Sequence, residues 1–217
     1  MLYKIKRING LITTNWDGEI WQKVEILELK NYMGPRPSHF PKVTAKLLYD
    51  SNNLYVFFKV EDKYVKAVAQ KLNDPICRDS CVEFFFTPSE NLLDGYFNIE
   101  INCGGTMLIC HQKARNKDKK KIFEQDCSKI KIFASMPKIV ETEIDAPTVW
   151  TLQYHLPFEI LEKYAKIDKP RGGAKWRANF YKCADNTSHP HWLTWNFVNG
   201  LKPDFHQPKY FGTLIFE

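Results

Sequence analysis

The sequence predicts an all-β fold, an antiparallel β-sandwich of the jelly-roll-like type with one short helix. Three observations favour this class: about ten segments with the strand pattern, turn residues between them, and no regular alternation of strands with helices. The chain has 217 residues, of which 44% are hydrophobic and 14% aromatic. That length can bury a full core without disulfides, and aromatic residues favour strands. We therefore expect residues 1–217 to form a single domain.

The clearest strands are a hairpin, "VTAKLLYD" at 43–50 and "LYVFFKVED" at 54–62, joined by a turn at 51–53. Residues 31–42 contain three prolines and are expected to be a loop. One helix is predicted over residues 157–165, because Pro157 suits a first helical turn. The remaining predicted strands are 2–8, 79–88, 95–105, 106–112, 129–136, 148–157, 174–184 and 209–217.

Charge and hydropathy exclude two classes of partner. The formal net charge is +6, and part of it lies in the run "RNKDKKK" at 115–121. Nucleic-acid binding would need a broader basic stripe with interleaved aromatic residues, so we expect no nucleic-acid partner. No stretch approaches the ~18 apolar residues of a membrane span. The N-terminal "MLYKIKRING" is too polar for a signal peptide. The expected location is cytoplasmic, or secreted or periplasmic if a leader has been removed.

Polar residues share faces in three of the predicted strands, because side chains alternate between the two faces of a sheet. Glu83 lies in an otherwise apolar strand, where a carboxylate needs partners. If the three faces meet, their carboxylate, amide and guanidinium groups can pair with the hydroxyls of a sugar, whose C–H face packs on an aromatic ring. The alternative is the solvated outer face of a sheet. The polar residues in question are Glu83, Asn98, Glu100, Arg177, Asn179 and Tyr181.

The segment "ANFYKCADNTSHPHWLTW", residues 178–195, contains metal-ligating and nucleophilic residue types. The C-x5-H-x-H spacing is not a standard zinc pattern, and no glycine-rich oxyanion turn adjoins the cysteine. We therefore expect neither a metal site nor a catalytic residue here, and expect most of the six cysteines to be reduced. A zinc site would have used Cys183, His189, His191 and His206.

Trp192 and Trp195 end this segment, where "HWLTW" returns to the sheet. Their odd separation makes them face opposite sides of a regular strand. We therefore expect at most one of them to contact a ligand.

The order of several blocks resembles the family 9 carbohydrate-binding modules over roughly residues 8–217. These blocks are "INGLITTNWDGEIWQKVEIL", "VTAKLLYDSNNLYVFFKVED", "RDSCVEFFFTP", "GYFNIEIN", "WTLQYHLPFEIL", "WRANFYKCAD", "SHPHWLTW" and "FHQPKYFGTLIF". The resemblance implies a β-sandwich that binds carbohydrate without cleaving it. In the xylanase-associated modules the site holds the reducing end of a β-glucan or xylan chain between two tryptophans, and calcium supports the loops.

Carried over residue by residue, the resemblance makes Glu83 a polar contact, since it lies within the matching strand motif. The block "KYVKAVAQKLNDPICR", where one tryptophan of the pair is expected, has none, and Tyr64 is its only aromatic residue. Structural calcium is implied without assigned ligands; the acids Asp50, Asp62 and Asp79 are scattered along the chain.

The sequence thus predicts non-catalytic saccharide binding. One alternative is a glycoside hydrolase acting through Glu83 and Glu100, which would need their carboxyl groups about 5–5.5 Å or 6.5–9.5 Å apart. The other is a β-sandwich that binds protein. The oligomeric state is not predicted. The expected contacts are Glu83, Asn98, Glu100, Arg177, Asn179 and Tyr181, with Trp195 or Trp192 as the stacking wall and Arg78 and Arg115 at the periphery.

Overall fold

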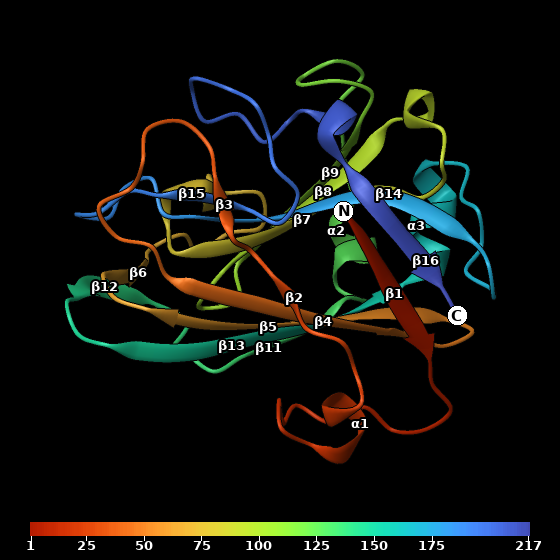
Figure 1. The fold of residues 1–217 in the computed structure, drawn as a ribbon, viewed down its shortest axis with the longest axis horizontal. Helices are drawn as coiled ribbons and strands as arrows, with labels where there is room; N and C mark the ends of the chain where they lie inside the picture. Colours follow the sequence, from red (N-terminus) through yellow and green to blue (C-terminus); the bar gives the residue numbers. More distant parts are fainter.

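The computed structural model describes residues 1–217, and two layers of β-strands face one another across the core (Figure 1). The upper layer has the strand order β10-β9-β8-β7-β14-β16-β1, and the lower layer continues as β1-β4-β5-β13-β11. The upper strands are β7 (Cys81–Thr87), β8 (Tyr96–Asn102), β9 (Met107–Gln112), β10 (Lys120–Lys121), β14 (Lys175–Cys183) and β16 (Gly212–Phe216), with β15 (Trp192–Thr194) and β3 (Asn31–Tyr32) added beside β14. The lower strands are β4 (Lys42–Tyr49), β5 (Asn53–Asp62), β11 (Lys131–Ala134), β13 (Thr148–Pro157) and the short β2 (Leu27–Glu28).

Strand β1 (Leu2–Arg7) belongs to both layers. Its first residues pair with β16, from Leu2 to Ile5, and its last two pair with β4. Both pairings are parallel, whereas all other strand pairs are antiparallel. The all-β sandwich is confirmed. The sequence pattern could not predict the two parallel pairs, because side chains alternate in the same way in parallel and in antiparallel strands.

The main core lies between the layers and follows from the alternation of side chains. Phe84 of β7 stacks on Phe180 of β14 with ring centroids 4.6 Å apart, and Phe58 of β5 meets Phe180 from the lower layer at 6.1 Å. Fully burying one such side chain contributes about 1.5–3 kcal/mol. These phenylalanines hold the two layers in contact.

The outer face of each layer is covered by further chain. Residues 196–211 lie over the upper layer, where Phe205 stacks on Tyr181 of β14 at 4.1 Å. The segment around the helix α1 (Glu19–Gln22) covers the lower layer, where Trp21 packs on Phe57 of β5. The central strands are therefore buried on both faces.

The helix predicted at 157–165 is observed as α3 (Phe158–Tyr164). All the predicted strands are observed, with ends that differ by a few residues. No helix is long and apolar enough to cross a lipid bilayer. The sequence pattern missed only short elements, which hold too few residues to show a period: β2, β3, β6 (Val65–Ala67), β10, β12 (Val140–Ile144), α1, α2 (Glu124–Cys127) and the 3-10 turns η1 (Ile76–Arg78), η2 (Leu92–Asp94) and η3 (Pro208–Tyr210).

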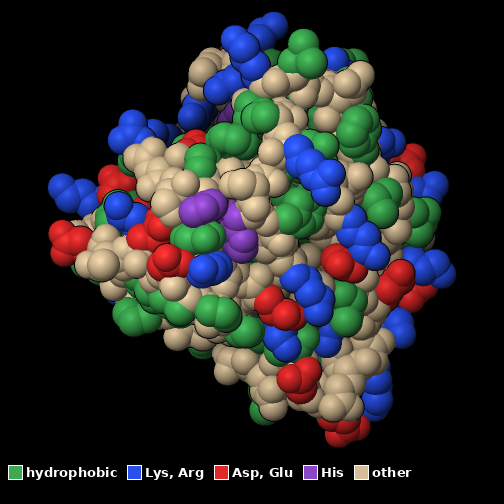
Figure 2. Space-filling model, turned by 60° about the vertical axis from the view of Figure 1, so that its left-hand side comes forward, with side chains coloured by type: hydrophobic (Ala, Val, Ile, Leu, Met, Phe, Trp, Pro, Cys, Tyr) green, Lys and Arg blue, Asp and Glu red, His purple; other side chains and the backbone are tan.

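Charged side chains of both signs are interspersed on the face drawn in Figure 2. Ion pairs between exposed side chains, such as Lys42–Glu61 and Lys63–Asp145, occur on the surface of the protein. That face therefore has no single-sign stripe of the kind that binds a phosphate backbone.

Candidate functional site

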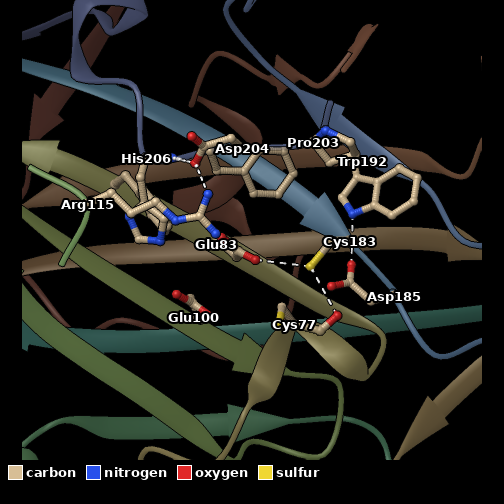
Figure 3. A pocket seen from close by; sticks show the side chains of 12 residues that line it. Cys77, Glu83, Glu100, Arg115, Cys183, Asp185, Trp192, Pro203, Asp204 and His206 are labelled. Carbon is tan, nitrogen blue, oxygen red and sulfur yellow. Dashed lines mark hydrogen bonds and ion pairs between the residues drawn. The ribbon is translucent and has the colours of Figure 1, made fainter. Parts of the chain in front are cut away.

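A cavity of about 150 Å³ opens on the outer face of the upper layer (Figure 3). Strands β7, β8 and β14 form its floor, and the turn η1, the loop around residue 115 and the segment 203–206 form its rim. Its walls hold four carboxyl groups and one guanidinium group. The lining residues are Cys77, Glu83, Phe85, Glu100, Arg115, Cys183, Asp185, Trp192, Pro203, Asp204, Phe205 and His206.

Glu83 and Glu100 lie directly opposite one another on β7 and β8. Residues paired in this way have Cα atoms about 4.5–5.5 Å apart and side chains on the same face. The two residues are only 2% and 7% exposed. Burial, and then the neighbouring Glu100, raises the pKa of Glu83 well above its usual range, and burial raises the pKa of Glu100 to about 7. The pair is therefore only partly ionised at neutral pH.

Glu100 is held by a chain of side-chain hydrogen bonds. Asn98 Nδ2 donates to Glu100 Oε1 at 3.0 Å, and Gln112 Nε2 donates to Asn98 Oδ1 at 3.0 Å. His206 Nδ1 lies 3.2 Å from the same Gln112 nitrogen and 2.9 Å from the hydroxyl of Tyr96. Burial lowers the pKa of His206 to about 4, so the ring is neutral and Nδ1 accepts from both donors. The network fixes the Glu100 carboxyl group at the cavity floor.

Glu83 has only thiol partners among its hydrogen bonds. The thiol of Cys183 donates to Glu83 Oε1 at 3.0 Å, and the thiol of Cys81 reaches the same oxygen at 3.5 Å. The two sulfur atoms are themselves 3.0 Å apart. All six cysteines of the chain are free thiols.

Trp192 forms the aromatic wall of the cavity. Its indole Nε1–H donates to Asp185 Oδ1 at 2.8 Å, which fixes the orientation of the ring (Figure 3). Burial raises the pKa of Asp185. At the rim, Arg115 Nη1 lies 3.2 Å from Asp204 Oδ1 and remains more than half exposed. An aromatic face, buried carboxyl groups and an exposed guanidinium group therefore meet in one small volume.

Four of the residues proposed from the sequence line this cavity: Glu83, Glu100, Arg115 and Trp192. Asn98 does not line the cavity but donates a hydrogen bond to Glu100, which does. Arg78 is on η1, where its charge acts on Asp185, but its side chain is not part of the lining.

Three of the expected contacts lie outside the cavity, because residues 196–212 cover them. Asn179 Nδ2 donates to the Asn196 carbonyl at 3.0 Å, and the Tyr181 hydroxyl donates to the Phe205 carbonyl at 3.2 Å. The Arg177 guanidinium donates to the carbonyls of Phe211 and Gly212. These side chains do share a sheet face with Glu83. Their polar groups bind the covering segment instead of facing the cavity.

Trp195 is excluded as a stacking wall. It is 3% exposed and packs in the main core against Phe180, with ring centroids 5.7 Å apart. Trp192 faces the cavity, so the two tryptophans do point to opposite sides, as their separation predicted.

The cysteine and histidines considered as a zinc set are not brought together. Cys183 bonds to Glu83, whereas His191 Nε2 lies 2.7 Å from Lys182 Nζ in the interior. His206 bonds to Tyr96 across the cavity floor.

Tyr64, the aromatic residue in the block that lacks a tryptophan, does not line the cavity. It stacks on His189 at 3.7 Å and packs edge-on against His39. Figure 2 shows histidine side chains lying together at the surface, and His39 and His189 are both partly exposed.

The acids considered for calcium are engaged elsewhere. Asp50 accepts bonds within its own turn and from Tyr55, and Asp79 accepts from Val68, Ala69 and Asn102. Asp62 accepts from the backbone N–H of Lys63 and from His39. A calcium ion needs six to eight converging oxygen ligands, and these three carboxylates do not supply such a set.

Several lining residues carried no sequence signal that pointed to this cavity, although Cys183 and His206 are among the residues considered above for zinc. Asp185 lies in a loop whose Asp and Asn residues are explained by turn chemistry, and Asp204 and His206 lie in a segment without periodicity. Cys77 lies on η1 and Cys183 at the end of β14, positions that are typical of ordinary buried thiols.

The solved structures that are similar in fold include the following three. A protein from Bacteroides uniformis, described as a candidate carbohydrate-binding protein, is 26% identical with a TM-score of 0.87, and the match covers 100% of this chain and 99% of that one. A family 9 carbohydrate-binding module from Caldicellulosiruptor kristjanssonii is 15% identical. Its complex with cellotriose has a TM-score of 0.68 with 100% and 94% coverage, and its complex with glucose 0.66 with 100% and 96%.

Among curated proteins, no significant match to this chain was found. The family model described as "Carbohydrate-binding family 9" matches residues 18–216, nearly the whole chain. With a β-sandwich and a cavity that combines an aromatic wall with buried carboxyl groups, the chain belongs to carbohydrate-binding family 9 and is a carbohydrate-binding module.

Proposed function

We propose that this module holds one terminal glucose-type unit of a saccharide in the cavity beside Trp192 and does not cleave it. The observation that carries the proposal is the aromatic ring of Trp192, fixed through its N–H beside the buried pair Glu83 and Glu100. A ring held in this way offers its face to the C–H groups of a sugar. The carboxyl groups can accept from, or when protonated donate to, the sugar hydroxyls.

The size of the cavity supports a chain end as the ligand. At about 150 Å³ it is smaller than the roughly 300–1,000 Å³ of sites for drug-sized ligands. The Caldicellulosiruptor module has been solved with glucose and with cellotriose, which share a glucose unit. A xylan chain end presents similar hydroxyls and is the second ligand to be compared.

The expected affinity is modest. Each net hydrogen bond contributes about 0.5–1.5 kcal/mol, and one stacked ring adds a similar amount. A few such contacts correspond to a dissociation constant between micromolar and millimolar.

The family, and not the ionisation of the carboxyl pair, supports binding over hydrolysis. A glycosidase needs one protonated acid together with one ionised carboxylate. Burial raises the pKa of both Glu83 and Glu100, and such a shift also occurs in catalytic acids. The match over residues 18–216 is to a family of binding modules, and the assay for released sugar tests the difference.

The proposal is tested by calorimetry with glucose, cellotriose and xylobiose, together with an assay for released reducing sugar. Trp192→Ala should weaken saccharide binding at least tenfold, since about 1.4 kcal/mol is tenfold. Phe197→Ala is the matched control, because this exposed aromatic residue lies outside the cavity. Absence of binding at millimolar saccharide, or release of sugar that depends on Glu83 or Glu100, would overturn the proposal.

A further inference from the structure

We propose that Cys81, Glu83 and Cys183 form a binding site for a thiophilic divalent cation of the zinc class, at the floor of the cavity. The site shares Glu83 and Cys183 with the lining of the cavity proposed for the saccharide, but binding of the ion does not require a bound saccharide. Its three ligand atoms come from neighbouring strands, all three residues are buried, and they lie within 4.8 Å of one another.

The distances suit a single ion. The sulfur atoms of Cys81 and Cys183 are 3.0 Å apart, and Glu83 Oε1 lies 3.5 Å and 3.0 Å from them. One ion can reach all three atoms at zinc–sulfur distances of about 2.3 Å and a zinc–oxygen distance of about 2.1 Å. A tetrahedral angle would open the sulfur–sulfur separation to roughly 3.7 Å, a shift within reach of cysteine side-chain rotation.

The strand register holds the ligands in place before any ion arrives. Cys81 of β7 and Cys183 of β14 are directly paired residues, so their side chains lie on the same face of the sheet. Glu83 is two residues beyond Cys81 and therefore also on that face. Ligands on rigid strands need little rearrangement to bind a cation.

The donor set selects the class of ion. Two thiols and one carboxyl group favour soft or borderline cations such as Zn²⁺ or Cd²⁺, whereas Ca²⁺ and Mg²⁺ prefer oxygen ligands. Bound as thiolates and carboxylate, the three groups would more than neutralise a double positive charge. Glu83 forms no ion pair with a lysine or arginine side chain; its hydrogen-bond partners are the two thiols. The nearby Lys182 directs its Nζ to Asp62 and His191 instead.

The fourth position of such an ion would face the cavity. Cys183 and Glu83 both line the cavity wall, while Cys81 lies behind them. A zinc ion with three protein ligands keeps one position for water or another small ligand. The cavity therefore gives the ion both a route of entry and an open coordination position.

The test uses the full chain kept reduced with a phosphine, and titrates it with Zn²⁺, Co²⁺ and Cd²⁺. Calorimetry gives the stoichiometry, and thiolate-to-metal charge-transfer absorption reports sulfur ligation. We expect one ion per chain, a dissociation constant of about micromolar or tighter, and release of the thiol protons. Cys81→Ser and Cys183→Ser should each weaken binding at least hundredfold, beyond the roughly 10–100-fold typical of outer-shell partners.

Cys127→Ser is the matched control and should bind as the parent does, because this buried thiol bonds only to the Ile122 carbonyl. Glu83→Gln keeps both thiols and should weaken binding at least tenfold, which tests the site even if the cysteine variants fail to fold. Unchanged binding in Cys81→Ser, or no binding by the reduced chain, would each overturn the proposal. Saccharide binding is measured separately, and Trp192→Ala distinguishes the two proposals: Trp192 lines the cavity but is not a ligand of the ion, so this variant should lose saccharide affinity and keep zinc binding.

Discussion

Lys182 of β14 and Asp62 of β5 form an ion pair across the two layers of the sandwich, with Nζ 3.2 Å from Oδ2 and both side chains fully buried. Lys182 Nζ also donates to His191 Nε2 at 2.7 Å and to the Cys183 carbonyl at 3.1 Å. Burial and the charge of Lys182 lower the pKa of His191 to about 3, so its ring is neutral and accepts. The pair joins the layers through β14, at the residue directly before Cys183.

Removing the charge of Asp62 should destabilise the fold strongly. Asp62→Asn leaves the Lys182 ammonium buried without a counter-charge, which typically costs about 3–5 kcal/mol. Urea unfolding at pH 7 measures the difference in free energy of unfolding. Asp145→Asn is the control, since the exposed pair of Asp145 with Lys63 should contribute at most about 1 kcal/mol. Equal losses in the two variants would contradict this account of the buried pair.

The same pair predicts acid sensitivity. Burial alone would raise the pKa of Asp62, but the Lys182 charge and the His39 hydrogen bond outweigh it and lower the pKa below its usual value. A depressed pKa in the folded state contributes stability above the unfolded pKa, near 4, and this stability is lost as the pH falls below it. We expect the free energy of unfolding of the parent to fall between about pH 4 and pH 2 more steeply than that of Asp62→Asn. If the free energies of unfolding of the parent and of Asp62→Asn fall in parallel over this pH range, the lowered pKa of Asp62 does not stabilise the folded state.

For Glu100 we expect the free energy of unfolding to change with pH in the opposite direction, and at higher pH. Its pKa of about 7, raised by burial, lies above the unfolded value of 4.5. The folded state then holds the proton more tightly, so stability should decrease as the pH rises from about 4.5 to 7. Glu100→Gln should flatten this decrease, which is on the order of 3 kcal/mol. Thermal unfolding of both proteins at pH 5, 6, 7 and 8 measures this decrease, and Glu124→Gln, at an exposed residue of α2, is the control.

Asp185 lines the cavity and also accepts the indole N–H of Trp192, and we expect its main effect on the ligand to come from orienting that ring. Asp185→Ala removes the acceptor of the indole N–H and frees the ring to rotate, which should weaken saccharide binding several-fold. Asp185→Asn keeps an oxygen acceptor and should restore most of the affinity. Calorimetry with cellotriose compares the two. If the alanine variant binds as tightly as the parent, the bond does not orient the ring.

Tyr181 should contribute to stability and not to saccharide affinity. Tyr181→Phe removes one buried hydrogen bond to the Phe205 carbonyl and keeps the stacked ring. The loss of stability should be about 1–3 kcal/mol, the cost of leaving the carbonyl unpaired. A large loss of affinity without loss of stability would show that the hydroxyl reaches the ligand.

The two-residue period of the sequence sufficed to place Asn98 and Glu100 on one face of their strand, Asn179 and Tyr181 on one face of theirs, and to separate Trp192 from Trp195. The period cannot show whether these faces meet the face of Glu83, because it relates residues within one strand only; the register of β7 with β8 and β14 brings them together. The period also could not show that residues 196–211 fold back over that face, because a segment without periodicity gives no sign of what it covers. Whether Asn179 and Tyr181 contact a ligand or form buried structural hydrogen bonds depends on residues 196–211, which cover them. The position of this segment is set by tertiary packing.

The parallel pairing of β1 with β16 joins the first strand of the chain to the last. Contacts so distant in sequence carry a large loop-closure entropy and slow the folding of a domain. During synthesis Tyr3 and Ile5 cannot reach Leu214 and Phe216 until all the residues between them have left the ribosome. Until then the strand that closes the two layers has an unpaired edge, and such edges aggregate. Yield on overexpression should therefore depend on the rate at which this last strand docks.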